Sequence, residues 1–248
     1  LTLDTTLNYT FSDNTYHSLG FGYSLKDYQV TNSNTASSNI KKSEGDSISF
    51  SISNDFARNA LNSYIKPSKG YFLSFANYLE TPSSSNNGFI KNIITGKKYY
   101  SFNKNIISAQ GKVGNIFSLN DSEILSDNKF SLGGNWLRGF DNFGAGPRNS
   151  RTSYVGGNNI IALKLDFSKP ITLNEQNPIY FNLFNDYGTV WENKNVVSFS
   201  DQDLRISYGF GISYYSPIGP IGFTWGFPLV DKDYDIKRMF LFSIGNLN

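Results

Sequence analysis

The chain has 248 residues, of which 39% are hydrophobic and 16% aromatic, and its formal net charge is +2. A near-neutral chain with scattered basic residues argues against a nucleic-acid-binding surface. With no cysteine and one histidine, the sequence excludes a disulfide scaffold and a thiolate metal site, and it leaves little material for a hydrolytic triad or a zinc site. We therefore expect no enzymatic activity, no metal and no cofactor.

Few aliphatic and many aromatic side chains are typical of two all-β architectures. One is a soluble β-sandwich with an aromatic core, and the other is an antiparallel up-and-down transmembrane β-barrel with aromatic girdles and a polar lumen. The sequence has no run of 18 apolar residues, so it predicts no transmembrane helix. The chain begins at Leu1 in strand-like alternation, with neither an initiator Met nor a signal peptide, so we expect a fragment.

About eleven segments alternate apolar and polar residues with a period of two, which indicates strands with one apolar face. No segment shows a helical period. The alternation is weak in 71–80 and 89–100, where aromatic residues occur on both faces. The predicted strands are 1–11, 18–25, 48–56, 71–80, 89–100, 107–113, 160–168, 179–188, 205–214, 221–229 and 238–247.

Long and short connections alternate between these strands. Short turns lie near Asp13, Asn103, Asn174 and Ile218, and 57–69 is a longer exception. The long connections are 26–45, 81–88, 118–157, 192–203 and 230–238. Short turns at one end and long loops at the other are the layout of an outer-membrane barrel. The polar face is rich in Gly, Ser, Thr and Asn, which suits a narrow lumen, so the sequence favours the barrel over the sandwich.

A glycine-rich stretch, 133–148, follows the sixth predicted strand and sets Arg138 among aromatic residues. Inside a barrel, a guanidinium is costly to desolvate unless carboxylates surround its five donors. Asp166 and Asp186 fall on the polar side of adjacent predicted strands, so they can converge on Arg138. The alternative is a solvated arginine, with the two aspartates lining a wet channel.

Four short motifs resemble those of the BamA family, the bacterial surface antigen family of outer-membrane assembly factors. They lie, in the family's order, at 66–71, 133–140, 185–191 and 215–220. The second is similar to the family's Val/Ile/Leu-Arg-Gly-Phe motif and contains Leu137, Arg138, Gly139 and Phe140. The resemblance implies that these four residues form a loop latch, with Asp166 and Asp186 as its acidic partners.

The resemblance also implies a domain organisation. Residues 1–248 would be the C-terminal part of one outer-membrane β-barrel domain, with about eleven of sixteen strands present and the N-terminal strands and POTRA domains missing. The long loop 118–157 would fold back into the lumen. The last strand would form one side of a lateral gate, although Asn248 stands where the family has a terminal aromatic residue; the gate residues would be Phe240, Phe242, Ile244 and Gly245.

By the same resemblance, the expected function is the folding and insertion of β-barrel proteins into the bacterial outer membrane, as the central subunit of the barrel assembly machinery. The expected partners are unfolded outer-membrane protein clients, accessory barrel-assembly lipoproteins and outer-membrane lipid. A related translocation-assembly or two-partner secretion transporter is the alternative function. A passive porin and a soluble binding module represent other classes.

Two further polar features have simpler interpretations. His17 is the single histidine and is expected at a surface or interface. Asp231, Asp233 and Asp235 form an Asp-x-Asp-x-Asp run that lacks the glycine and distal glutamate of an EF-hand loop. We expect this run to be a solvated extracellular loop.

Overall fold

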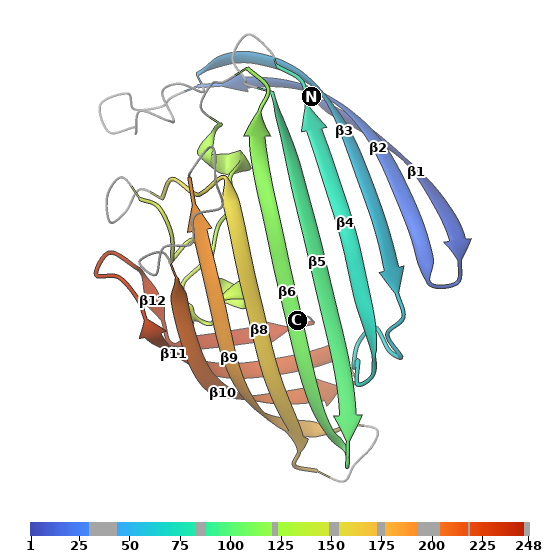
Figure 1. The fold of residues 1–248 in the computed structure, drawn as a ribbon, viewed down its shortest axis with the longest axis vertical. Helices are drawn as coiled ribbons and strands as arrows, with labels where there is room; N and C mark the ends of the chain where they lie inside the picture. Colours follow the sequence, from blue (N-terminus) through green and yellow to red (C-terminus); the bar gives the residue numbers. More distant parts are fainter. Residues whose placement is uncertain are drawn as a thin grey trace.

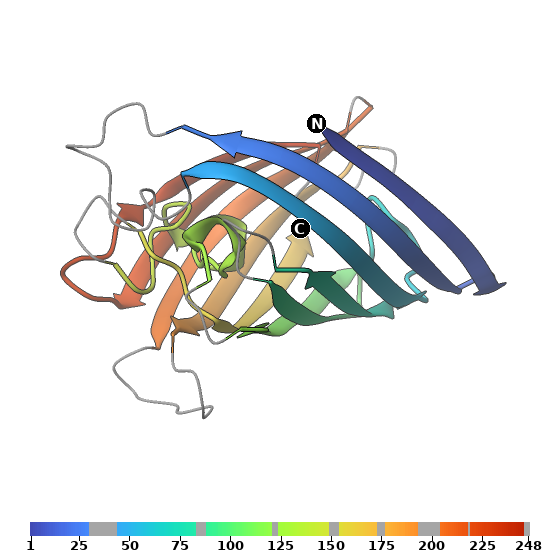
Figure 2. The same ribbon diagram turned by 90° about the horizontal axis from the view of Figure 1, so that it is seen from above.

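A single curved sheet of eleven antiparallel strands dominates the computed structural model (Figure 1). Viewed from above, the sheet wraps around an interior that contains loop segments and short helical turns (Figure 2). The structure describes residues 1–29, 44–82, 88–120, 124–148, 154–172, 177–192, 204–217 and 219–245. Within these residues the first and last strands of the sheet do not pair with each other, so the wall is an open, partial barrel.

The strands follow one another around the wall in chain order, as a meander. The predicted all-β antiparallel fold is therefore confirmed. The wall strands are β1 Thr2–Ser12, β2 Thr15–Tyr28, β3 Gly45–Asn59, β4 Gly70–Glu80, β5 Phe89–Phe102, β6 Asn105–Ser118, β8 Asn159–Pro170, β9 Ile179–Trp191, β10 Arg205–Ser216, β11 Gly219–Val230 and β13 Phe240–Ile244. Two very short strands, β7 Gly139–Phe140 and β12 Lys237–Arg238, pair with each other in a separate two-stranded ladder.

Turn geometry explains the short connections at one end of the wall. Asn103 and Lys104 join β5 to β6 with positive φ angles of 46° and 66°, the left-handed conformation that two-residue hairpin turns require. Gly70 starts β4 with a φ of +100°, and a Cβ atom there would lie 2.0 Å from the carbonyl oxygen of Ala60. That close approach explains why a glycine closes the longer turn between β3 and β4.

Side chains alternate between the two faces of the wall as the sequence predicted. On β9, Leu183 is 47% exposed on the outside, while Asp186 is fully buried on the inside. On β10, Tyr208 is exposed and Ser207 is buried. An apolar outside and a polar inside are typical of a strand that faces lipid on one side and a lumen on the other. No helix in the described part of the chain is long and apolar enough to cross a membrane.

The strands with ambiguous alternation carry aromatic residues on their inner face. Leu73 and Ile94 are exposed on the outside, whereas Phe89 and Tyr99 are buried on the inside. Phe89 belongs to a hydrophobic cluster that joins the wall to the long loop between β6 and β8. Aromatic residues therefore occur on both faces because the inner face packs against a loop.

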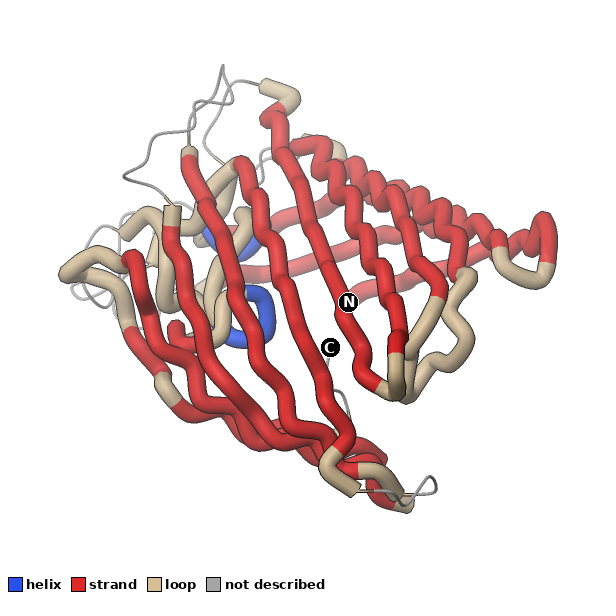
Figure 3. Tube along the Cα trace, turned by 60° about the horizontal axis from the view of Figure 1, so that its bottom comes forward, coloured by secondary structure: helices blue, strands red, loops and turns tan. Residues whose placement is uncertain are grey.

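The described part of loop 118–157 supplies six of the eleven buried residues of this cluster. Figure 3 shows its two 3₁₀ turns, η1 Ser126–Asn128 and η2 Gly134–Trp136, in blue on the concave side of the wall. The loop contributes Ile124, Phe130, Leu132, Leu137, Phe140 and Ala145, and the wall contributes Phe89, Ile116, Ile160, Ala162 and Val190. Because these side chains are nearly all removed from solvent, the loop and the wall share one apolar core.

The start of the last strand differs from the prediction of 238–247. Lys237 and Arg238 leave the wall and pair with β7, and the wall strand β13 begins only at Phe240. The reason is a competing partner, because the long loop offers a free backbone edge at Gly139 and Phe140. Leu247 and Asn248 lie outside the described residues.

Candidate functional site

Glycine geometry sets the position of Arg138. Gly133 and Gly139, on either side of the arginine, have φ angles of +129° and +96°, in the region that glycine alone adopts without strain. Gly139 also lies against the wall, where a Cβ atom at Gly226 would be 2.5 Å from its backbone nitrogen. Two glycines facing each other thus let the loop backbone touch β11.

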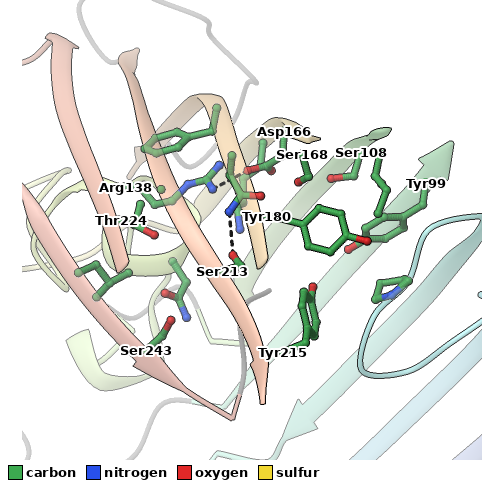
Figure 4. Close-up of a pocket in the computed structure, with 18 residues that line it drawn as sticks. Tyr99, Ser108, Arg138, Asp166, Ser168, Tyr180, Ser213, Tyr215, Thr224 and Ser243 are labelled. Carbon is green, nitrogen blue, oxygen red and sulfur yellow. Dashed lines mark hydrogen bonds and ion pairs between the residues drawn. The ribbon is translucent and has the colours of Figure 1, made fainter. Parts of the chain in front are cut away.

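The Arg138 side chain reaches two carboxylates on neighbouring wall strands. Its Nε and one terminal nitrogen donate to Asp186 on β9 at 2.7 and 2.5 Å, and the other terminal nitrogen donates to Asp166 on β8 at 2.6 Å. The backbone N–H of Arg138 also donates to Asp186, at 2.9 Å. Figure 4 shows the guanidinium pointing toward Asp166 inside the wall. The structure therefore brings together all three residues that the sequence proposed.

Burial makes this ion-pair network a strong local constraint. The side chains of Arg138, Asp166 and Asp186 are 12%, 14% and 0% exposed. The guanidinium carbon lies 3.7 Å from the ring centre of Phe184, which adds a cation–π contact. Burial by itself lowers the pKa of Arg138, but the hydrogen bonds to Asp186 and the two carboxylate charges raise it overall. The arginine is a permanent cation, and its surroundings hold it in one orientation.

A small polar cavity adjoins the arginine on the lumen side. It has a volume of about 80 Å³ and is lined by Arg138, Lys164 and Asp166 together with tyrosines and serines (Figure 4). Tyr180 and Tyr215 meet edge to face within this lining, with ring centres 5.9 Å apart. A space of this size holds a few water molecules. No group of three His, Asp or Glu side chains in the described residues is placed to bind a metal ion.

A second buried ion pair holds the segment before the last strand, and it corrects the expected solvated aspartate run. Asp235 is 5% exposed, and its carboxylate accepts hydrogen bonds from Arg205 on β10 at 2.7 and 3.2 Å. Asp231 forms an ion pair with Lys237, whereas Asp233 is exposed as expected. The prediction was wrong for Asp235 because periodicity assigns Arg205 to the inner face but does not reveal which loop residue covers it.

These two buried pairs lie on loops that are joined by backbone hydrogen bonds. Asp141 donates its N–H to the carbonyl of Ile236 at 2.9 Å, and Ile236 donates to the carbonyl of Gly144 at 2.9 Å. The β7–β12 ladder continues the pairing, with Lys237 opposite Phe140 and Arg238 opposite Gly139. The arginine loop is therefore fixed both to the wall and to the segment that leads into β13.

The structure places the predicted gate residues apart from the Arg138 network. Phe240, Phe242 and Ile244 are 45%, 48% and 61% exposed on the outer side of β13. Gly245 has a φ of +82° and donates its N–H to Pro220 at 2.8 Å. Within the described residues β13 pairs only with β11, so its other edge is open. The latch residues Leu137 and Phe140, in contrast, are buried in the loop core, with exposures of 0% and 1%.

Three named proteins are similar to this chain in sequence. The chain is 25% identical to the outer membrane protein assembly factor BamA of Nitratidesulfovibrio vulgaris, over 98% of this chain and 31% of that protein. It is 27% identical to BamA of Neorickettsia risticii, over 97% and 33%. It is 26% identical to a SAM50-like protein of Schizosaccharomyces pombe, over 82% and 45%. The chain thus spans about a third of the length of the two BamA relatives.

A solved structure and a family model agree with these relatives. The crystal structure of BamA from Haemophilus ducreyi lacking POTRA domains 1–3 matches with a TM-score of 0.78 and 22% identity, over 97% of this chain and 53% of that one. This match shows the barrel fold. The model of the Omp85 superfamily domain matches residues 1–247. The chain therefore belongs to the Omp85 superfamily.

Proposed function

We propose that this chain is the barrel portion of a factor that folds β-barrel proteins and inserts them into the bacterial outer membrane. The observation that supports it most is the Arg138 network, which fixes a long loop inside an Omp85 barrel wall. The chain is an outer-membrane protein, in keeping with its apolar exterior and its relatives. Two of those relatives are named outer membrane protein assembly factors.

An open strand edge supplies the chemistry that such a function needs. Within the described residues β13 pairs on one side only, with β11. We propose that its other edge, at the seam with the first strand of the whole barrel, opens to pair with an incoming strand by β-augmentation. The incoming strand would come from an unfolded outer-membrane protein client. Accessory barrel-assembly lipoproteins and outer-membrane lipid are the other partners that we propose. Strand pairing and bilayer disturbance involve no covalent step, so the proposed activity is not enzymatic.

The related transporters remain the second candidate. A translocation-assembly or two-partner secretion transporter would use the same fixed arginine loop. A passive porin fits less well, because the hydrophobic cluster of the loop fills part of the lumen. Steady, large conductance of the full-length protein in planar bilayers would favour the porin.

Depletion of the full-length protein in its own cells tests the proposal. The expected result is a fall in folded outer-membrane porins, measured by heat-modifiable migration on gels, while inner-membrane proteins stay at their normal level. Plasmid-borne wild-type protein should restore the porins. Normal porin levels after depletion, with loss of one secreted substrate, would favour the transporter instead.

A further inference from the structure

A row of asparagines crosses the outer face of the wall on five neighbouring strands. They are direct register partners from β3 to β8: Asn54, Asn77, Asn92, Asn115 and Asn159. The side-chain nitrogen of Asn77 donates to the oxygen of Asn92 at 2.5 Å, and Asn92 donates likewise to Asn115 at 2.8 Å. We call these five residues the asparagine row.

The lower and central parts of the row lie inside the apolar exterior of the wall, whereas Asn159 is the first residue of β8. Val113 and Phe117, the outward residues on either side of Asn115, are 50% and 53% exposed. Ile52 and Phe56 flank Asn54 in the same way, at 41% and 44%. The central asparagines are half-buried, so their amides can be reached from the outside. A line of amides on a lipid-facing surface is unusual, because apolar residues normally form that band.

The row climbs across the wall from the short-turn end toward the long-loop end. Asn54 stands five residues before the end of β3 at Asn59, and Asn159 stands eleven residues before the end of β8 at Pro170. This difference corresponds to about 20 Å along a strand, and to about 15 Å of membrane depth for strands tilted by roughly 40°. At the lower end, Nε2 of His17 lies 2.6 Å from the side-chain oxygen of Asn54.

The central amide, that of Asn92, has hydrogen-bonding capacity beyond the row itself. An asparagine side chain carries two N–H donors and an oxygen with two lone pairs. Asn92 uses one donor and accepts once within the row. Its second N–H and remaining lone pair have no partner within the row, and lipid chains offer none. The row therefore favours a partner that brings both donors and acceptors to this depth.

Two candidate occupants fit the slope of the row poorly. The polar headgroup zone is only about 5 to 7 Å thick on each side of the hydrocarbon core, so lipid headgroups would reach the ends of the row alone. A second copy of this chain would present its own row on the facing wall. Because a row runs perpendicular to strands tilted by roughly 40°, the two rows would cross at about 80° and touch at one point. The strands of that copy would run nearly along the row, but their outward residues, such as Phe210 and Ile212 on β10, are apolar and offer no partner to the amides.

We propose that the asparagine row is a docking surface for a transmembrane β-barrel of another protein, which lays one strand with outward polar side chains along it. All barrel strands tilt with the same hand, so strands of two facing walls cross at about 80°. A line perpendicular to the strands of one wall, such as the asparagine row, therefore runs within about 10° of the strands of the facing wall. This surface uses neither the loop network nor the β13 edge, so it does not depend on the proposed function.

Site-specific photo-crosslinking of the full-length protein in its native outer membrane tests this docking. A photoreactive amino acid replaces Ile94, which is 49% exposed on the outside of β5 beside Asn92. The matched control replaces Leu183, which is 47% exposed on the outside of β9, away from the row. The expected adduct joins position 94, but not position 183, to an outward-facing strand of a second barrel, identified by mass spectrometry of the crosslinked peptide.

Substitutions in the row separate docking from mere proximity. The triple variant Asn77→Leu, Asn92→Leu and Asn115→Leu should lower the adduct yield by about tenfold or more, since polar contacts between membrane segments are worth about 0.6 kcal/mol each on average. Asn92→Gln, which keeps the amide, should stay near the wild-type yield. If heat-modifiable migration shows that the triple variant does not fold, the single variant Asn92→Leu replaces it, with an expected loss of about threefold. An unchanged yield, or adducts only with lipid or with a second copy, would overturn the proposal.

Discussion

Arg138 has two carboxylate partners that are not equivalent. Asp186 receives the backbone N–H and two guanidinium nitrogens and is fully buried, whereas Asp166 receives one nitrogen and is 14% exposed. A buried charge that loses its partner is strongly destabilising, while a partly solvated one is less so. Most of the positioning of the loop should therefore come from Asp186.

Neutralising each carboxylate in turn tests this ranking. Asp186→Asn should weaken the attachment of the loop to the wall by on the order of 3 kcal/mol. Tryptic cleavage after Arg148 should therefore rise by roughly a hundredfold. Asp166→Asn should raise it by about tenfold, as for one hydrogen bond to a charged group. Cleavage is measured on the folded protein in proteoliposomes. Equal rates for the two variants would contradict the asymmetric network.

The alternation of the strands predicted both aspartates, but not their ranking. Asp166 and Asp186 each fall on a polar face, so the sequence places them in the lumen. Their unequal shares arise from register, because Asp186 lies opposite Lys164 and the loop backbone passes directly over it. Register across strands and the path of a loop are tertiary properties, which a single sequence does not specify.

At the scale of elements, two loops act as one body. The β7–β12 ladder and the Arg205–Asp235 pair join the arginine loop to the segment that precedes β13. The sequence assigned Arg238 to the last strand, because an extended segment looks the same whether it pairs with the wall or with a loop. It also missed Asp235, since no periodicity identifies the residue that covers an inward arginine.

Loss of the second ion pair should loosen the segment before β13. Asp235→Asn leaves Arg205 without its carboxylate in a buried site, so the segment should open more often. Tryptic cleavage after Arg238 is expected to rise by at least about tenfold. Asp233→Asn is the matched control, because Asp233 is exposed in the same run, and it should leave the cleavage rate unchanged. Equal rates in both variants would show that the pair does not hold the segment.

Close backbone contact is the other constraint on the loop. Gly226→Ala puts a methyl group 2.5 Å from the nitrogen of Gly139, so the loop must move away from β11 even though every charged residue is kept. Hydrogen exchange at the Gly139 and Phe140 amides should become at least about tenfold faster. Gly96→Ala should have no such effect, since the nearest atom to its Cβ lies 3.9 Å away. Unchanged exchange in Gly226→Ala would show that the contact is dispensable.

At the scale of the molecule, the sequence predicted the eleven-stranded meander and its two faces correctly, since both follow from a period of two. Between residues 71 and 100 the sequence did not show which face is inner and which is outer, and the structure explains why. Inner residues such as Phe89 pack against the loop, while Asn77 and Asn92 stand on the outer face. Apolar residues inside and amides outside reverse the usual assignment of faces. The weak alternation between residues 71 and 100 therefore has two causes: inner residues that pack against the loop, and the asparagine row on the outer face.

The central claim is that a barrel wall with its loop fixed by Arg138 assembles other outer-membrane barrels. The most direct measurement is the rate at which a urea-unfolded porin folds into proteoliposomes that contain the full-length protein. Wild-type protein and Arg58→Ala, whose arginine is exposed on β3, should accelerate folding equally over empty liposomes, and Arg138→Ala should lose most of that acceleration. Equal folding rates with wild-type protein and with empty liposomes, or full acceleration by Arg138→Ala, would contradict it.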